Sequence, residues 1–335
     1  MTSRQSGALK LAFLLVLTCS VLETHGSFVY AQQEPAATAP AAPAAAPGRG
    51  GRGAAPLDPR VQIRSYRFTE TNEDLPYAVF VSSKVRSDTK APLVIALHGL
   101  GGNHTTMMRG NALDLAEQGG YILVGPMGYS PSGWYGGPAV GGPGRRGRGP
   151  GAPAAPGAPG APGANPAAAS PQAPAPARGP APVPVGGQAV TDPAKVSELS
   201  EKDVMTVLDM IRKEFNVDER RIYLMGHSMG GAGTLYLMVK HARVWAAAAA
   251  IAPAAFSLQP ASLSQIPEMP VLIIHGDADT VVPVNVSRSW AAQMKELNKP
   301  HHRYIEVPGG DHGNVIGIGM PDIFAFFSAN TKPAR

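Results

Sequence analysis

Apolar and polar positions follow two different periods along this chain. Strict alternation in two early segments predicts a first, antiparallel pair of strands. Several later runs are apolar throughout, which is typical of strands buried on both faces of a sheet. The predicted strands are Val61–Phe68, Tyr77–Val81, Leu93–Leu97, Ile122–Val124, Arg221–Met225, Trp245–Ile251, Val271–Ile274 and Arg303–Val307.

Between these runs, apolar residues recur at helical spacing. The predicted helices are Glu198–Phe215, Met229–His241, Val286–Leu297 and Asp322–Ser328. Strands that alternate with helices indicate an α/β fold with a mostly parallel central sheet covered by helices on both faces. Reactive side chains are then expected on loops at the carboxyl ends of the strands.

The first 57 residues lack this pattern. Residues 1–31 begin with a positively charged region that contains Arg4 and Lys10, followed by a short apolar run, Leu11–Leu17. A cleavage motif ends at Ala31, and these features together predict a signal peptide. Residues 32–57 are rich in proline and alanine and predict a disordered linker. The protein is therefore expected to be exported, periplasmic or secreted, without stable membrane insertion. The alternative of lipid anchoring uses Cys19, the single cysteine, but Thr18 before it is unusual for that role.

A second biased segment interrupts the remaining domain, 58–335. The chain has 39 glycines and 34 prolines, and they are concentrated in 32–57 and 138–190. Residues 138–190 contain no aromatic and no acidic side chain, so they predict a disordered insert. The biased segments also hold six arginines that account for the formal net charge of +5. A basic face on the folded domain is therefore not implied, and nucleic acid is not an expected partner.

One serine lies in a motif that exposes a nucleophile. Gly226-His227-Ser228-Met229-Gly230 has the form G-x-S-x-G and stands between a predicted strand and a predicted helix. Small residues at both ends of this motif permit the sharp turn that presents the serine. The helix starting after Ser228 directs N–H groups toward a developing oxyanion, with the Met229 amide as a candidate donor.

An acid and a base follow in the order that such a serine requires. Asp279 comes after the strand Val271–Ile274, and His312 comes after the strand Arg303–Val307. Ser228, Asp279 and His312 thus follow three separate strands and predict a catalytic triad. Asp277 is the rival acid, and Asp311 is a weaker one. Four other histidines, His98, His227, His301 and His302, are expected to have no role as the base.

Two further loops are expected to face the same edge of the sheet. The glycine-rich loop after Leu93–Leu97 offers the Leu100 amide as the second oxyanion donor. The loop after Ile122–Val124 carries Trp134 and Tyr135, which either line a substrate pocket or pack against the sheet. No metal-ligand spacing, phosphate-binding loop or dinucleotide fingerprint occurs, so we expect no cofactor and no metal.

The sequences HGLGGN, GHSMGGAGT, HGDADTVVP and GGDHGN together resemble the α/β-hydrolase superfamily. The resemblance covers nearly all of 60–135 and 191–330. It is nearest to prolyl-oligopeptidase-like, dienelactone-hydrolase-like and feruloyl- or polyhydroxybutyrate-esterase-like branches. It implies the α/β-hydrolase fold, Ser228 as nucleophile, Asp279 as acid, His312 as base, and Leu100 and Met229 as oxyanion amides. Dienelactone hydrolases use a cysteine nucleophile, and this chain has serine instead.

These features predict an exported serine hydrolase that cleaves carboxylic esters through an acyl-enzyme intermediate. Its expected substrate is a small-molecule or polymer-linked ester. One alternative is a small peptidase or amidase of the prolyl-oligopeptidase-like type, because the same triad can cleave amides. The other is a catalytically silent hydrolase fold that acts as a binding module.

Overall fold

A computed structural model describes residues 56–138, 186–266 and 268–333. The predicted signal peptide, nearly all of the predicted linker and most of the predicted insert lie outside these residues. The domain boundaries predicted there stay predictions.

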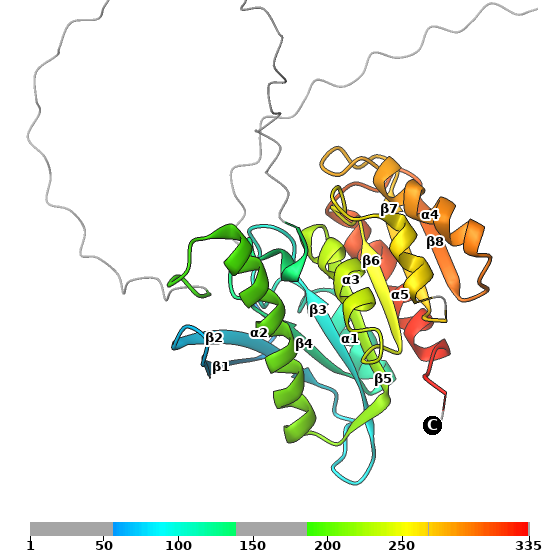
Figure 1. The fold of residues 1–335 in the computed structure, drawn as a ribbon. Coiled ribbons are helices and arrows are strands. Elements are labelled where there is room, and N and C mark those ends of the chain that lie inside the picture. The colour runs from blue at the N-terminus through cyan, green and yellow to red at the C-terminus, as the bar shows by residue number, and fades with distance from the viewer. Residues whose placement is uncertain (1–55, 139–185, 267, 334–335) are drawn as a thin grey trace, which may run out of the picture. The chain divides into compact units, whose positions relative to one another are not determined.

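The described residues form one eight-stranded sheet with the order β1-β2-β4-β3-β5-β6-β7-β8 (Figure 1). Strand β2 is antiparallel to both of its neighbours, β1 and β4, and all other neighbours are parallel. The strands are β1 (Gln62–Phe68), β2 (Glu73–Val81), β3 (Ala91–Leu97), β4 (Ile122–Pro126), β5 (Val217–His227), β6 (Ala247–Ile251), β7 (Val271–Gly276) and β8 (His302–Val307). The predicted α/β fold with a mostly parallel sheet is confirmed.

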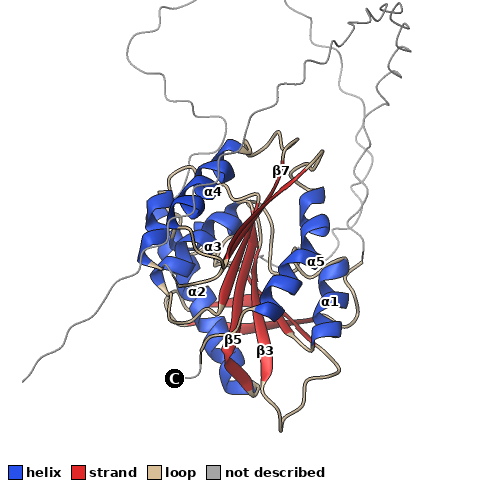
Figure 2. Cartoon of the chain, turned by 90° about the vertical axis from the view of Figure 1, so that its right-hand side faces the viewer, coloured by secondary structure: helices blue, strands red, loops and turns tan. Residues whose placement is uncertain are grey.

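Helices cover both faces of the sheet (Figure 2). One face carries α2 (Pro193–Glu214), α3 (Met229–Lys240) and α4 (Asn285–Leu297), and the other carries α1 (Asn111–Gly119) and α5 (Asn314–Ala329). Two short 3₁₀ helices, η1 (Trp134–Gly136) and η2 (Pro260–Gln265), lie in the connecting loops. This two-sided cover explains why β3, β4, β6 and β7 are buried along their whole length.

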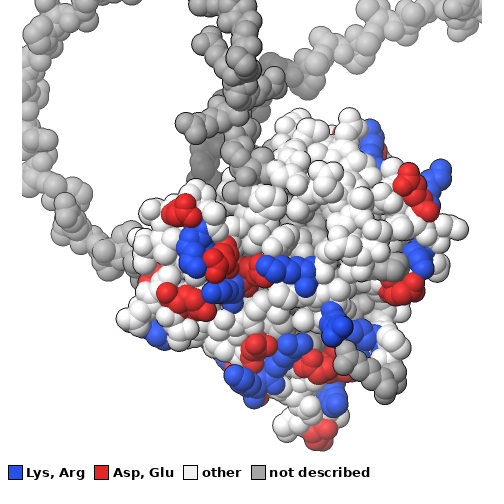
Figure 3. Space-filling view, viewed as in Figure 1, with Lys and Arg blue, Asp and Glu red and all other residues white. Residues whose placement is uncertain are grey.

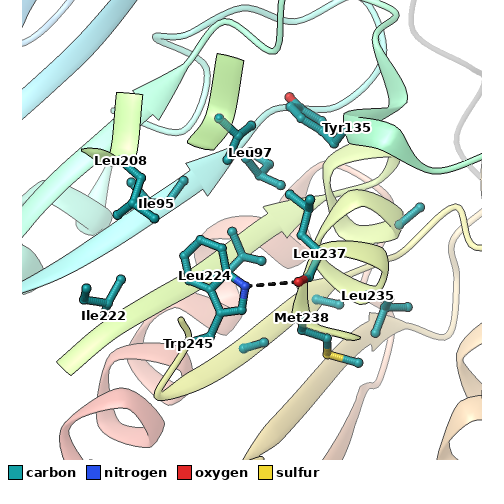
Figure 4. Packing of buried hydrophobic residues seen from close by; sticks show 14 of the residues in the cluster. Ile95, Leu97, Tyr135, Leu208, Ile222, Leu224, Leu235, Leu237, Met238 and Trp245 are labelled. Atoms are coloured by element: carbon teal, nitrogen blue, oxygen red, sulfur yellow. Dashed lines mark hydrogen bonds between the residues drawn. The ribbon is translucent and has the colours of Figure 1, made fainter. Parts of the chain in front are cut away.

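Aliphatic side chains join the helices to the sheet (Figure 4). Ile95 of β3 and Leu224 of β5 belong to one buried cluster with Leu208 of α2 and Leu237 of α3. The buried indole N–H of Trp245 donates to the carbonyl oxygen of Leu237 at 3.1 Å. This packing fixes α3 relative to the carboxyl ends of the strands. It therefore also fixes the loop that precedes α3 in the chain.

The predicted insert ended at residue 190, and the structure corrects that boundary. The Gly187 N–H donates to the Tyr129 carbonyl at 2.5 Å, and the Val190 N–H donates to the Tyr129 hydroxyl at 3.2 Å. Two more N–H groups in this stretch, of Gln188 and Ala189, donate to the Glu73 carboxylate at 2.6 and 2.9 Å. Residues 186–190 are hydrogen-bonded parts of the domain, because these backbone groups find fixed acceptors there.

Charged side chains of both signs are interspersed on the face in Figure 3, and its upper part carries few of them. Several are paired, as in the contacts Arg212–Glu219 at 2.9 Å and Lys240–Glu201 at 2.8 Å. In the part of the chain that the structure describes, every helix is too short or too polar to cross a membrane.

Candidate active site

Ser228 occupies a strained turn between β5 and α3. Its backbone has φ 56° and ψ −116°, a region that non-glycine residues rarely adopt. The turn is tightly enclosed, because a Cβ atom on Gly226 would lie 2.3 Å from the Gly230 carbonyl oxygen. A Cβ atom on Gly230 would lie 2.3 Å from the carbonyl oxygen of Leu97 in β3. The two glycines of the motif are therefore required by close backbone approach, and the predicted serine turn is present.

Asp279 lies in the loop after β7, and its side chain is fully buried. Its Oδ1 atom accepts hydrogen bonds from the N–H groups of Val281 and Val282 at 2.8 and 2.9 Å. Burial alone would raise the pKa of Asp279. Hydrogen bonds from His312 and from the two valine N–H groups outweigh that effect and hold the pKa below its ordinary value. Asp279 is therefore ionised at neutral pH.

His312 lies in the loop after β8 and is joined to Asp279. Its Nδ1 atom lies 2.6 Å from Asp279 Oδ2, and its side chain is 18% exposed. The Nδ1 atom carries the proton in this contact, which leaves Nε2 as the basic atom of the ring. No hydrogen bond joins the Ser228 hydroxyl to His312 among the described residues, and contacts of this kind often tighten only when substrate binds.

The His227 side chain contacts His312 in the loop after β8. Its Nε2–H donates to the His312 carbonyl oxygen at 2.7 Å, and the centroids of the two rings are 4.5 Å apart. Burial lowers the pKa of His227 to about 4, so this ring is neutral at neutral pH. His227 is a structural support, in agreement with its predicted place outside the triad.

The two rival acids contact other groups. Asp277 Oδ1 accepts from the Gly309 N–H at 2.7 Å and so links the loops after β7 and β8. Asp311 Oδ1 accepts from the N–H groups of Gly313 and Asn314, at 2.8 and 2.7 Å, at the start of α5. Both are exposed. The structure brings Asp279, and neither rival, to the His312 ring.

The loop after β3 lies directly against Ser228. A Cβ atom on Gly99 would stand 3.3 Å from the Ser228 Cβ atom. Leu100 is the next residue along the chain, so its backbone lies close to this contact. Among the described residues, no acceptor receives the Leu100 N–H or the Met229 N–H. Both N–H groups therefore have no hydrogen-bond acceptor within these residues, as a donor to an oxyanion requires.

Trp134 and Tyr135 are buried in the core between α2 and α3, with exposed fractions of 9% and 0%. The Tyr135 hydroxyl donates to the carbonyl oxygen of His98 at 3.1 Å, at the start of the loop that contains Leu100. His98 in turn places its Nε2 atom 2.7 Å from the Met127 carbonyl oxygen. The burial of these two side chains favours the packing alternative, and the pocket expectation stays a prediction.

Sequence reasoning gave no role to His275, the last but one residue of β7. This ring is fully buried, and its Nε2 atom lies 3.2 Å from Asp279 Oδ2. A histidine directly after an apolar strand and four residues before the acid was the only available signal. Within the described ranges, no group of three or more histidine, cysteine or acidic side chains is placed to hold a metal ion.

Known proteins resemble this chain in sequence and in fold. A family model described as PET hydrolase-like matches residues 177–326. An 80-residue stretch is 38% identical to the bifunctional acetylxylan esterase/xylanase XynS20E of Neocallimastix patriciarum, which is 24% of this chain and 11% of that protein. The chain thus spans about a tenth of the length of this curated relative.

Solved structures share the fold. A ferulic acid esterase of Anaeromyces mucronatus has a TM-score of 0.55 and 18% identity, over 84% of this chain and 93% of that one. A thermostable esterase has a TM-score of 0.54 and 20% identity, over 82% and 64%. These likenesses place the chain in the fold of α/β hydrolases.

Proposed function

We propose that this chain, which has the fold of α/β hydrolases and matches a PET hydrolase-like family model over residues 177–326, is a serine hydrolase that cleaves carboxylic esters through an acyl-enzyme intermediate. The observation that carries the proposal is the 2.6 Å contact between His312 Nδ1 and Asp279 Oδ2, on the same edge of the sheet as the strained Ser228 turn. A silent fold has no need of a serine held at positive φ or of an ionised, fully buried acid.

In this mechanism the Ser228 hydroxyl attacks the ester carbonyl carbon, and its proton passes to His312 Nε2. Asp279 stabilises the imidazolium that forms. The carbonyl oxygen becomes an oxyanion that accepts hydrogen bonds from the Leu100 and Met229 N–H groups. The carbon–oxygen bond to the alcohol then breaks, and the leaving oxygen takes the proton from His312.

Water completes the reaction. It attacks the acyl-enzyme carbonyl and gives a proton to His312 Nε2, and the second tetrahedral intermediate then releases the acid. His312 returns that proton to the Ser228 oxygen as the acyl bond breaks. Each cycle therefore consumes one ester and one water and needs no group outside the chain.

The surroundings of the site favour uncharged substrates. Leu100, Phe256 and Val281 follow β3, β6 and β7, and their exposed fractions are 54%, 49% and 62%. Residues 128–138 and 252–266, which follow β4 and β6, contain no charged side chain. We therefore extend the proposal to esters whose acyl and alcohol parts are neutral and apolar, free or attached to a polymer.

The test combines a fluorophosphonate probe with paired substrates. The parent protein, Ser228→Ala and the control Ser264→Ala, which changes an exposed serine of η2, are each labelled and assayed with p-nitrophenyl acetate and the matching p-nitroanilide. We expect labelling and ester turnover in the parent and control, and neither in Ser228→Ala. Faster cleavage of the anilide would favour the peptidase alternative, and an unlabelled parent would favour the silent fold.

Export is a separate part of the proposal and rests on the sequence of residues 1–31. Mass spectrometry of the protein isolated from the periplasm or the medium tests it. We expect a mature N-terminus at Gln32. An intact Met1 on the protein from the cytoplasm, with none outside, would contradict export.

A further inference from the structure

The Asp279 carboxylate contacts a second histidine besides His312. His275 Nε2 lies 3.2 Å from Asp279 Oδ2, the same oxygen that His312 Nδ1 approaches to 2.6 Å. The His275 ring is fully buried, and none of the hydrogen bonds in the proposed reaction uses it. The carboxylate thus has four donors, two histidine rings on Oδ2 and two backbone N–H groups on Oδ1.

The surroundings of His275 fix where its proton lies. Its Nε2 atom faces two acceptors, Asp279 Oδ2 and the Val282 carbonyl oxygen at 3.0 Å, so Nε2 must carry a hydrogen. Its Nδ1 atom lies 2.6 Å from the Ser287 hydroxyl oxygen. Burial lowers the pKa of His275, so the ring is neutral and Nδ1 accepts the hydroxyl proton. Ser287, in the first turn of α4, therefore selects the required tautomer.

We propose that His275, oriented by Ser287, is a positioning residue that fixes the Asp279 carboxylate for its contact with His312. The backbone N–H groups of Val281 and Val282 hold only Oδ1, so without His275 the His312 contact alone would fix Oδ2 against rotation about the Cβ–Cγ bond. The N–H of His275 adds a second contact that holds Oδ2. The inference rests on the proposed function, because it gives His275 an effect on turnover through the triad.

A role in the fold alone is the competing explanation. The His275 N–H also donates to Val282 and so closes the loop after β7. A loss of that bond would lower the stability and the fraction of folded protein. It would leave turnover per folded site unchanged. Turnover per active site, rather than total activity, therefore separates the two explanations.

The experiment compares His275→Leu, His275→Gln, Ser287→Ala and the control His302→Leu. Leucine removes both ring nitrogens, whereas the glutamine side-chain amide can keep a donor near the Nε2 position. His302 lies on the neighbouring strand beside Val271, at the opposite end of β7 from His275. Active sites are counted by complete reaction with the fluorophosphonate, and kcat and KM are then measured with p-nitrophenyl acetate.

We expect kcat per titrated site to fall about 10- to 100-fold in His275→Leu, as for loss of one hydrogen bond to a charged group, with KM nearly unchanged. In His275→Gln most of the parental kcat per titrated site should be retained. Ser287→Ala should lower kcat per site by a smaller factor than His275→Leu, and His302→Leu should have the parental kcat per site. A His275→Leu protein with parental kcat per site would overturn the inference. A parent that neither reacts with the probe nor turns over ester would instead refute the proposed function. If His275→Leu does not fold, Ser287→Ala is the test of the inference. A parental kcat per titrated site in Ser287→Ala would then overturn it.

Discussion

At the scale of single residues, the choice between two acids two positions apart decides the chemistry of the site. Asp277 and Asp279 follow the same strand, but the chain turns between them. Asp279 is directed into the protein, where four donors and complete burial hold it beside His312. Asp277 stays exposed and supports the Gly309 turn. The two side chains therefore have different partners despite their shared sequence context.

Exchanging each carboxylate for its amide should separate these roles. Asp279→Asn should lower kcat/KM for p-nitrophenyl acetate by roughly 10³- to 10⁴-fold, because an amide neither stabilises the imidazolium nor holds His312 in the correct tautomer. Asp277→Asn should cost less than about 10-fold, since it changes only one exposed hydrogen bond. A larger loss from Asp277→Asn than from Asp279→Asn would reverse the assignment of the acid.

Much of the site could be predicted because its residues follow recognisable strands. Ser228, Asp279 and His312 each lie within about five residues of the end of a predicted strand, and parallel strands bring such positions to one edge. The contact of His275 with Asp279 could not be predicted in this way. It depends on the path of the loop from 276 to 282, which returns the acid to the end of its own strand.

At the scale of the elements, tertiary contacts explain what the sequence pattern missed. The predicted last helix began at Asp322, whereas α5 begins at Asn314 and contains Pro321. Proline has no N–H to donate to the Gly317 carbonyl four residues earlier. The Asn111 side chain of α1 donates to that carbonyl at 2.9 Å instead. Helix α1 was itself not predicted, because its nine residues are too few for a clear period.

Helix α2 holds the loop after β4 through a buried acid. Asp203 accepts hydrogen bonds from the Tyr66 hydroxyl at 2.5 Å and from the N–H groups of Gly128 and Tyr129 at 2.6 and 3.1 Å. Burial raises the pKa of Asp203 to about 6 despite these donors. The protonated form is thus favoured in the native state relative to the unfolded chain, where the pKa is near 3.9.

The stability that Asp203 contributes should therefore depend on pH with a negative slope. Its contribution is complete below about pH 4 and is lost as the pH rises through about 6, by about 3 kcal/mol at most. Urea unfolding of the parent and Asp203→Asn at several pH values measures this effect as a difference. The free energy of unfolding of the parent minus that of the variant should fall between pH 4 and pH 7. A difference that is flat or rises would contradict the shifted pKa.

At the scale of the whole molecule, the sheet places the loops of the site and both ends of the biased segment in one region. Segment 128–138 leads into the residues that the structure does not describe, and residues 186–190 return from them. Gly187 bonds to Tyr129, and the Ser197 hydroxyl of α2 donates to the Gly137 carbonyl at 2.7 Å. Composition alone located this segment, but it could not locate the hydrogen bonds that set its end.

Two deletions that end before or after residues 186–190 should differ in their effect on stability. Replacing 139–185 with a short Gly/Ser linker should leave the melting temperature and small-ester turnover close to parental values, since lengthening a loop costs only about 0.6 kcal/mol per doubling. Replacing 139–190 also removes the bonds to Tyr129 and Glu73 and should destabilise the protein by about 2–4 kcal/mol. Calorimetry and p-nitrophenyl acetate assays of both proteins measure this. Equal melting temperatures would show that residues 186–190 contribute nothing to the fold.

The bonds that fix Gly137 and Gly187 have a practical consequence for engineering. Gly187 is hydrogen-bonded to Tyr129 of the loop after β4, and Gly137 is hydrogen-bonded to Ser197 of α2, so both ends of the biased segment are anchored to the domain. A folded cargo whose own termini lie close together, such as a binding domain or a fluorescent reporter, can be spliced in there as a passenger. The inserted domain would then be joined to the protein at two points rather than one, which restricts its orientation more than a terminal fusion does.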